Sequence, residues 1–238
     1  YAGLVTPAIT VDNLEIRYGD AVALSGVDLT VPPGSSLAVI GPNGSGKSTL
    51  LAALAGTIES SAGSSHIAGP APALVLQATD VDKSLPITVR DTVSLARYPR
   101  LGLFRPFRPK DRVAVDRALN RMAIEDLAPR QLHDLSGGQR QRVLVAQGLA
   151  QESEVLLLDE PVNGLDLVSR SLILHVIDEE LTSGQTERCL DRGLLGGKAE
   201  QWRDAGHRST RDHGHDEGDG HRTPQAGQFV DVAGAGAD

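Results

Sequence analysis

The sequence lacks the features that define several large classes of protein. Its single cysteine, Cys189, excludes a disulfide framework and fits a reducing compartment. No apolar run approaches the roughly 20 residues that a membrane-spanning helix needs. We also expect no signal peptide, so any membrane association must come through a partner. The net charge of −8 argues against nucleic-acid binding, which normally requires a basic surface.

Aromatic residues are scarce at 3%, so burial must come from Leu, Val, Ala and Ile, which recur in short regular segments. Apolar and polar residues alternate over 9–16 and 22–31, which predicts two strands joined by a turn. Further strands are predicted at 36–40, 73–77 and 155–158, and helices at 47–54, within 88–122, and at 136–151 and 172–181. This order predicts an α/β fold with an N-terminal antiparallel region, a mainly parallel core sheet and a helical insertion over about 88–150.

A glycine-rich loop between the strand at 36–40 and the helix at 47–54 matches the phosphate-loop pattern G-x-x-x-x-G-K-[ST]. Backbone N–H groups in such a loop surround phosphate oxygens, and the helix N-terminus adds its dipole. Lys47 would contact the β- and γ-phosphates of ATP, and Ser48 would contact Mg²⁺. The predicted strand before this loop and the predicted helix after it disfavour the alternative of a glycine-rich turn that binds nothing. The candidate ATP-binding residues are Gly41, Asn43, Gly44, Ser45, Gly46, Lys47, Ser48 and Thr49.

A second Gly/Ser motif precedes the helix predicted at 136–151. Leu135-Ser136-Gly137-Gly138-Gln139, followed by Arg140-Gln141-Arg142, resembles the signature motif of ABC-type ATPases. Ser136 and two glycines at a helix start make a second anion-binding N-terminus. The resemblance implies that Ser136, Gly137, Gly138 and Gln139 face the γ-phosphate held by the other subunit of a head-to-tail homodimer.

The segment 155–161 resembles the Walker B motif of the same family. The resemblance implies that Asp159 holds Mg²⁺ and that Glu160 is the general base that polarises the attacking water. Asp166 matches the D-loop, which crosses the dimer interface, and Gln77 stands where the family has a glutamine that senses Mg²⁺ and nucleotide. Tyr18 lies where the family places an aromatic residue that stacks on adenine; a core or turn tyrosine is the alternative.

Residues 84–93 and 97–102 are similar to the insertion in manganese, zinc and iron importer ATPases. This resemblance implies a divalent metal ion as the substrate, with a siderophore or haem as the alternative. It also implies an integral-membrane permease as partner, an extracytoplasmic solute-binding protein acting indirectly, and a position on the inner face of the plasma membrane. Basic residues crowd the segment, and they indicate either a solvated helical face or part of a permease groove. They are Arg97, Arg100, Arg105, Arg108, Lys110 and Arg112.

Two other functions compete with transport. Cytosolic ABC-type ATPases of DNA repair carry long coiled-coil insertions, and those of translation usually carry two cassettes. This chain has no heptads between its phosphate loop and its signature motif, and it has one cassette. The other alternative is a module that binds nucleotide but does not hydrolyse it.

The sequence changes character after the cassette predicted over 1–186. The family continues into a buried strand ending in Thr-His-Asp, whose histidine contacts the γ-phosphate. Residues 187–193 have four charged side chains among seven and no histidine, so we do not expect them to form that strand. The tail 187–238 holds only six Val, Ile, Leu, Met or Phe residues, which predicts disorder.

We interpret this tail as the product of a shifted reading frame. Zinc binding is the alternative interpretation, because four histidines lie among acidic residues, but their spacing is irregular. They are His207, His213, His215 and His221.

Overall fold

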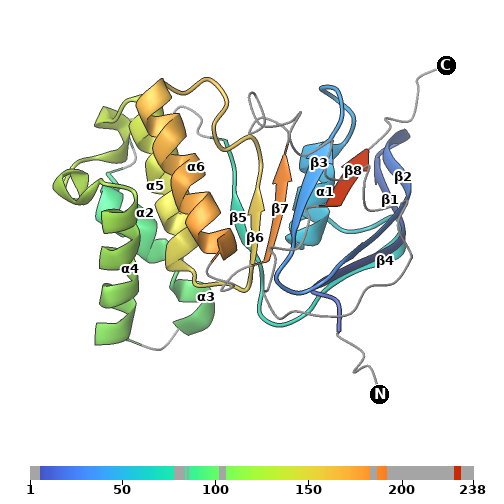
Figure 1. The fold of residues 1–238 in the computed structure, drawn as a ribbon, viewed down its shortest axis with the longest axis horizontal. Coiled ribbons are helices and arrows are strands. Elements are labelled where there is room, and N and C mark those ends of the chain that lie inside the picture. Colours follow the sequence, from blue (N-terminus) through green and yellow to red (C-terminus); the bar gives the residue numbers. More distant parts are fainter. Residues whose placement is uncertain are drawn as a thin grey trace, which may run out of the picture.

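The computed structural model describes residues 6–77, 84, 86–101, 106–182, 187–191 and 228–231, and Figure 1 shows two sheets with a group of helices at one side. The antiparallel sheet has the order β2-β1-β4. Its strands are β1 (Ile9–Tyr18), β2 (Ala21–Val31) and β4 (Ala62–Ile67). The parallel sheet has the order β5-β6-β7-β3-β8. Its strands are β3 (Ser36–Ile40), β5 (Ala73–Val75), β6 (Val155–Leu158), β7 (Glu187–Asp191) and β8 (Gln228–Asp231).

Most helices lie beyond the β5 edge of the parallel sheet, and the antiparallel sheet lies at the opposite side (Figure 1). The helices are α1 (Lys47–Leu54), α2 (Val89–Leu95), α3 (Tyr98–Leu101), α4 (Pro109–Arg121), α5 (Gly137–Ala150) and α6 (Leu167–Thr182), with 3₁₀ turns at Glu125–Leu127 and Leu132–Asp134. Among the described residues, no helix is both long and apolar enough to cross a bilayer. The predicted fold class is confirmed: the chain has an antiparallel N-terminal region, a parallel core sheet and inserted helices.

Strand β6 lies between two hydrophobic cores. Its side chains alternate, so that Leu156 and Leu158 pack in the core beneath α2, α4, α5 and α6. Val155 and Leu157 pack in the other core, against β1, β2, β3 and α1. All four are buried, which is the environment that the uninterrupted apolar run predicted.

Strand β4 and the start of helix α6 differ from the predictions. Strand β4 was not predicted, because its sequence AGSSHI has no alternation of apolar residues and its side chains are mostly exposed. Helix α6 begins at Leu167, earlier than the predicted 172, because its exposed first turn shows no apolar periodicity.

The expectation that residues 187–193 form no strand was wrong for Glu187–Asp191. This segment is β7, which pairs in parallel with β6 on one side and β3 on the other. The physical reason is backbone pairing: β3 and β6 each present peptide groups to the space between them, and any extended segment can satisfy those groups. Gln228–Asp231 forms β8 on the far side of β3, and the tail histidines lie outside the described residues.

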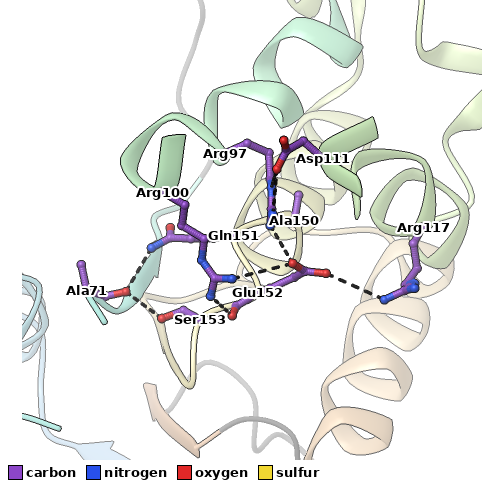
Figure 2. A network of polar contacts seen from close by, with 9 residues as sticks. All are labelled: Ala71, Arg97, Arg100, Asp111, Arg117, Ala150, Gln151, Glu152 and Ser153. Atoms are coloured by element: carbon purple, nitrogen blue, oxygen red, sulfur yellow. Dashed lines mark hydrogen bonds and ion pairs between the residues drawn. The ribbon is translucent and has the colours of Figure 1, made fainter. Parts of the chain in front are cut away.

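A buried arginine connects the ends of the inserted helices (Figure 2). Arg97 is 3% exposed, and its Nε and Nη2 donate to Asp111 Oδ1 at 3.1 and 3.0 Å. Its Nη1 donates to the carbonyl of Ala150 and to Glu152 Oε2, both at 2.8 Å. Burial opposes the charged form of Asp111, but hydrogen bonds from the Arg108 backbone and from Arg97 outweigh it and hold the pKa of that carboxyl below its ordinary value.

We predict that Asp111→Asn lowers the free energy of unfolding at pH 7 by about 3 kcal/mol, because it removes the buried countercharge of Arg97 and leaves only the more exposed Glu152. A carboxyl with a lowered pKa in the folded state stabilises the fold above its unfolded pKa. This contribution is lost as the pH falls through the folded pKa. Urea unfolding should therefore show the gap between wild type and variant narrowing below about pH 4. A gap that stays constant from pH 7 to pH 3 would contradict this origin.

Candidate functional site

The loop between β3 and α1 brings its charged side chain back over its own backbone. Lys47 opens α1, and its Nζ donates to the carbonyl oxygens of Gly41 and Pro42 at 3.2 and 3.0 Å. The side chain is largely buried, with the residue only 7% exposed. These contacts hold a positive charge inside the loop at the carboxyl end of a parallel strand, where ligands of α/β sheets bind.

Gly46 cannot be replaced by a larger residue without displacing β2. Its φ is +90°, and a Cβ atom there would lie 2.5 Å from Leu24 Cδ2 and 2.7 Å from the carbonyl oxygen of Ala23. The loop therefore packs directly on β2, and this contact fixes the start of α1.

Two oxygen ligands meet beside this loop. Ser48 Oγ donates to Asp159 Oδ1 at 3.1 Å, although the two residues are 111 positions apart in the chain. Adjacent ligand oxygens of an octahedral Mg²⁺, each about 2.1 Å from the ion, are about 3 Å apart. The hydroxyl and the carboxylate therefore have the chemistry and the separation that Mg²⁺ requires.

A pocket of about 270 Å³ opens over these groups. Glu160, which follows Asp159, lines it together with residues of the phosphate loop and β2. The lining residues are Ala23, Asn43, Gly44, Gly46, Lys47, Ser48, Thr49 and Glu160. The hydroxyl of Ser45 is buried beneath the loop and has no hydrogen-bond partner in the described part of the chain. One pocket thus combines a lysine, the carboxylate of Glu160, the hydroxyls of Ser48 and Thr49 and glycine-rich backbone, and Asp159 is hydrogen-bonded to Ser48 in its lining.

The predicted signature residues lie at the start of α5 and not in this pocket. Ser136 accepts from the backbone N–H of Gln139 at 3.3 Å, and Gln139 Oε1 accepts from the backbone N–H of Ser136 at 3.0 Å. This reciprocal capping box defines the helix start. Ser136 and Gly137 are exposed and do not line the pocket.

Asp166 connects the signature helix to α6. Its Oδ1 accepts from the backbone N–H of Ser169 at 2.9 Å, so it caps α6, and hydrogen bonds from Ser169 hold the pKa of Asp166 below its ordinary value. A Cβ atom on Gly138 would lie 2.7 Å from Asp166 Oδ2 and 2.8 Å from Ser169 Oγ. The two helix starts are therefore in direct contact within one chain.

Gln77 and Tyr18 lie outside the pocket. Gln77 is exposed after β5, and the carbonyl of the preceding residue, Leu76, accepts from the buried Gln141 Nε2 at 3.4 Å. Tyr18 is 56% exposed at the end of β1, which disfavours the alternative of a core tyrosine.

Sequence reasoning missed one residue of this region, Asn163. Its Nδ2 donates to Glu160 Oε2 at 2.7 Å. An asparagine three positions after a candidate base is within reach in a tight turn, and Pro161 and the pair Asn163-Gly164 are turn signals that could have indicated it.

Comparison with known proteins agrees with this geometry. A family model described as ABC transporter matches residues 24–163, from within β2 to Asn163. The chain belongs to the ABC transporter family. By family it is an ATP-binding, ABC-type ATPase whose hydrolysis is coupled to transport. Among curated proteins, the manganese transport system ATP-binding protein MntB of Listeria monocytogenes is 39% identical over 184 residues, covering 74% of this chain and 76% of its own length.

Two further relatives extend the comparison. The probable siderophore transport system ATP-binding protein YusV of Bacillus subtilis is 40% identical over 183 residues, covering 72% of this chain and 66% of its own length. A solved inward-facing structure of a putative metal-chelate type ABC transporter has 29% identity and a TM-score of 0.70, covering 79% of this chain and 74% of the other. The resemblance to the metal-importer group that the sequence suggested is therefore confirmed at the level of family.

We predict that Gly138→Ala lowers the free energy of unfolding by about 1–3 kcal/mol, because the added methyl group overlaps Asp166 and Ser169. Gly137→Ala is the matched control: a Cβ there has no atom within 4 Å, and its φ is unexceptional. That variant should be neutral or slightly more stable, since alanine is the better helix former. Equal urea midpoints for the two variants would show that α5 and α6 do not make this contact.

Proposed function

We propose that this chain is the ATP-binding subunit that energises import of a divalent metal ion through a membrane permease. The observation that carries the proposal is the convergence of Lys47, Ser48 and Glu160 at one pocket, with Asp159 hydrogen-bonded to Ser48. In this proposal the β- and γ-phosphates of ATP lie in loop 41–46, and Lys47 exchanges the carbonyls of its own loop for phosphate oxygens.

Ser48 and Asp159 would hold Mg²⁺, and the ion would neutralise phosphate charge. Glu160 would accept a proton from the attacking water. The water oxygen would form a bond to the γ-phosphorus as the bond from that phosphorus to its bridging oxygen breaks, and the electron pair would leave on ADP. The exposed ring of Tyr18 would stack on adenine. Gln77, which is also exposed, would sense Mg²⁺ and nucleotide.

A second copy of the chain would complete the site. Gly137 and Gly138 open α5, and the first N–H groups of a helix can bind an anion, yet Ser136 and Gly137 do not line the pocket of their own chain. A head-to-tail homodimer would place this helix start of one subunit over the phosphate loop of the other. Asp166, exposed beside it, would then lie at the subunit interface.

The partner in the membrane would be an integral permease, fed by an extracytoplasmic solute-binding protein, with this chain on the inner face. Exposed apolar side chains on and beside the inserted helices support a docking surface there. They are Leu76, Leu95, Tyr98 and Val113. Charged neighbours such as Arg100 and Lys110 line an adjacent cavity of about 400 Å³. No role in nucleic-acid binding is proposed.

The metal substrate is supported by the names of the relatives, one a manganese and one a siderophore transport protein. A divalent ion agrees with the insertion at 84–102, and a siderophore or haem is the competing substrate. Uptake of radiolabelled manganese and of iron-loaded siderophore, compared in cells with and without this chain, separates the two.

We predict that Lys47→Ala raises the Kd for ATP by roughly 10- to 100-fold, because a charged hydrogen bond contributes about 1.5–3 kcal/mol. Lys110→Ala is the control, since this exposed lysine lies on the inserted helices away from the pocket. Binding of a fluorescent ATP analogue measures both. Unchanged affinity in Lys47→Ala would refute the proposed site.

A second candidate is a nucleotide-binding module of this family with impaired hydrolysis. In this proposal residues 1–186 are the cassette and 187–238 an out-of-frame tail. The observation that favours it is β7, which occupies the position between β6 and β3 yet has no histidine within it or in the residues that follow, up to His207. The histidine that the family resemblance requires near the γ-phosphate is therefore missing.

Under this second candidate, phosphate release by the unaltered chain should exceed that of Glu160→Gln by no more than roughly tenfold. A working general base contributes about 10²- to 10⁴-fold. A ratio above a hundred would show that the missing histidine is dispensable and would favour the first candidate.

A further inference from the structure

Glu160 has a backbone conformation that needs support. Its φ is +44°, in the left-handed region, and Pro161 follows it. A residue with a Cβ atom is disfavoured there, and a following proline restricts it further. The conformation therefore persists only because neighbouring groups hold it.

Asn163 supplies two of those contacts. Its backbone N–H donates to the carbonyl oxygen of Glu160 at 3.2 Å, which closes the turn. Its side-chain Nδ2 donates to Glu160 Oε2 at 2.7 Å. A donor this close to a carboxylate makes a short, charge-assisted hydrogen bond. The same residue thus fixes both the backbone and the carboxylate of Glu160.

We propose that Asn163 is the positioning residue of the general base: its amide occupies Oε2 and leaves Oε1 as the oxygen that takes the proton from water. This inference rests on the proposed role of Glu160. A carboxylate held by one oxygen cannot rotate freely, so its second oxygen keeps a fixed direction relative to the pocket that Glu160 lines.

The hydrogen bond from Asn163 to Glu160 also depends on the position of the neighbouring loop, residues 163–166. Asn163 is exposed and lies three residues before Asp166, which caps α6 and contacts Gly138 at the start of α5. A displacement of the loop 163–166 would therefore move the amide away from Oε2. The orientation of the base is coupled in this way to the position of the signature helix in the same chain.

The test uses three substitutions in the full chain. Asn163→Leu removes the donor at similar size, Asn163→Ser restores a shorter donor, and Asn163→Asp places a second carboxylate against Glu160. The matched control is Asn120→Asp, because Asn120 also donates its side-chain amide to a glutamate, Glu125, on the exposed surface of the inserted helices.

For turnover, we expect Asn163→Leu to lower kcat by roughly tenfold at unchanged KM, a fraction of the roughly 10²- to 10⁴-fold that general-base catalysis contributes, with partial recovery in Asn163→Ser. Asn163→Asp should lower kcat at least as far as Asn163→Leu, because its carboxylate cannot donate to Oε2 and repels the carboxylate of Glu160. Asn120→Asp should change neither quantity.

A double-mutant cycle at positions 160 and 163, measured by thermal unfolding, tests the contact between the two residues even where turnover is too slow to measure. Asn163→Asp should lower the Tm, because its carboxylate replaces the amide that donates to Glu160. This loss should be smaller in the Glu160→Gln background, where the substituted amide can donate to the new carboxylate. Absence of any coupling between positions 160 and 163 in this cycle would overturn the proposal. So would a kcat for Asn163→Leu within twofold of the unaltered chain.

Turnover of the Glu160→Gln variant distinguishes failure of the proposed function from failure of the positioning role alone. Turnover that survives Glu160→Gln removes the proposed base and the proposed function with it. Turnover that Glu160→Gln abolishes but Asn163→Leu leaves intact removes only the positioning role.

Discussion

The spacing between β3 and β6 is the constraint on which the candidate site depends. Parallel strands lie about 4.8 Å apart, so one intervening strand, β7, separates β3 from β6 by about 10 Å. At that separation Ser48, after the phosphate loop that follows β3, reaches Asp159 at the end of β6, and the two oxygens meet at 3.1 Å. A lysine-bearing loop on one strand and two acids on the other can then enclose a pocket without either strand bending toward the other.

A second set of contacts links the site to the inserted helices. Glu160 is held by Asn163, the loop continues to Asp166, and Asp166 lies against Gly138 at the start of the signature helix. These contacts lie within one chain, although the pocket and the start of α5 are separate in it. Each subunit therefore carries a phosphate loop and a helix start that does not line the pocket of its own chain. A head-to-tail pair would bring the helix start of one subunit to the phosphate loop of the other.

Sequence reasoning succeeded where one local pattern determines one local structure. The bounds of β3, α1 and β6 agree with their apolar patterns, and the phosphate loop lies between the predicted strand and helix. It failed for β4, which is held by pairing with β1 and has no apolar alternation, and for β7, whose charged residues pair because the gap between β3 and β6 requires a strand. Asn163 was missed because its contact depends on the left-handed backbone of Glu160; Pro161 and the pair Asn163-Gly164 indicate a turn but not this conformation.

The Mg²⁺ dependence of ATP affinity, compared between the unaltered chain and Asp159→Asn, tests the central claim most directly. We expect Mg²⁺ to tighten ATP binding to the unaltered chain. Asp159→Asn should lose this gain while binding ATP at least as well when the metal is chelated, since it removes a negative charge beside the phosphates. An Asp159→Asn variant that keeps the full Mg²⁺ dependence would contradict the pairing of Ser48 and Asp159 as the metal site.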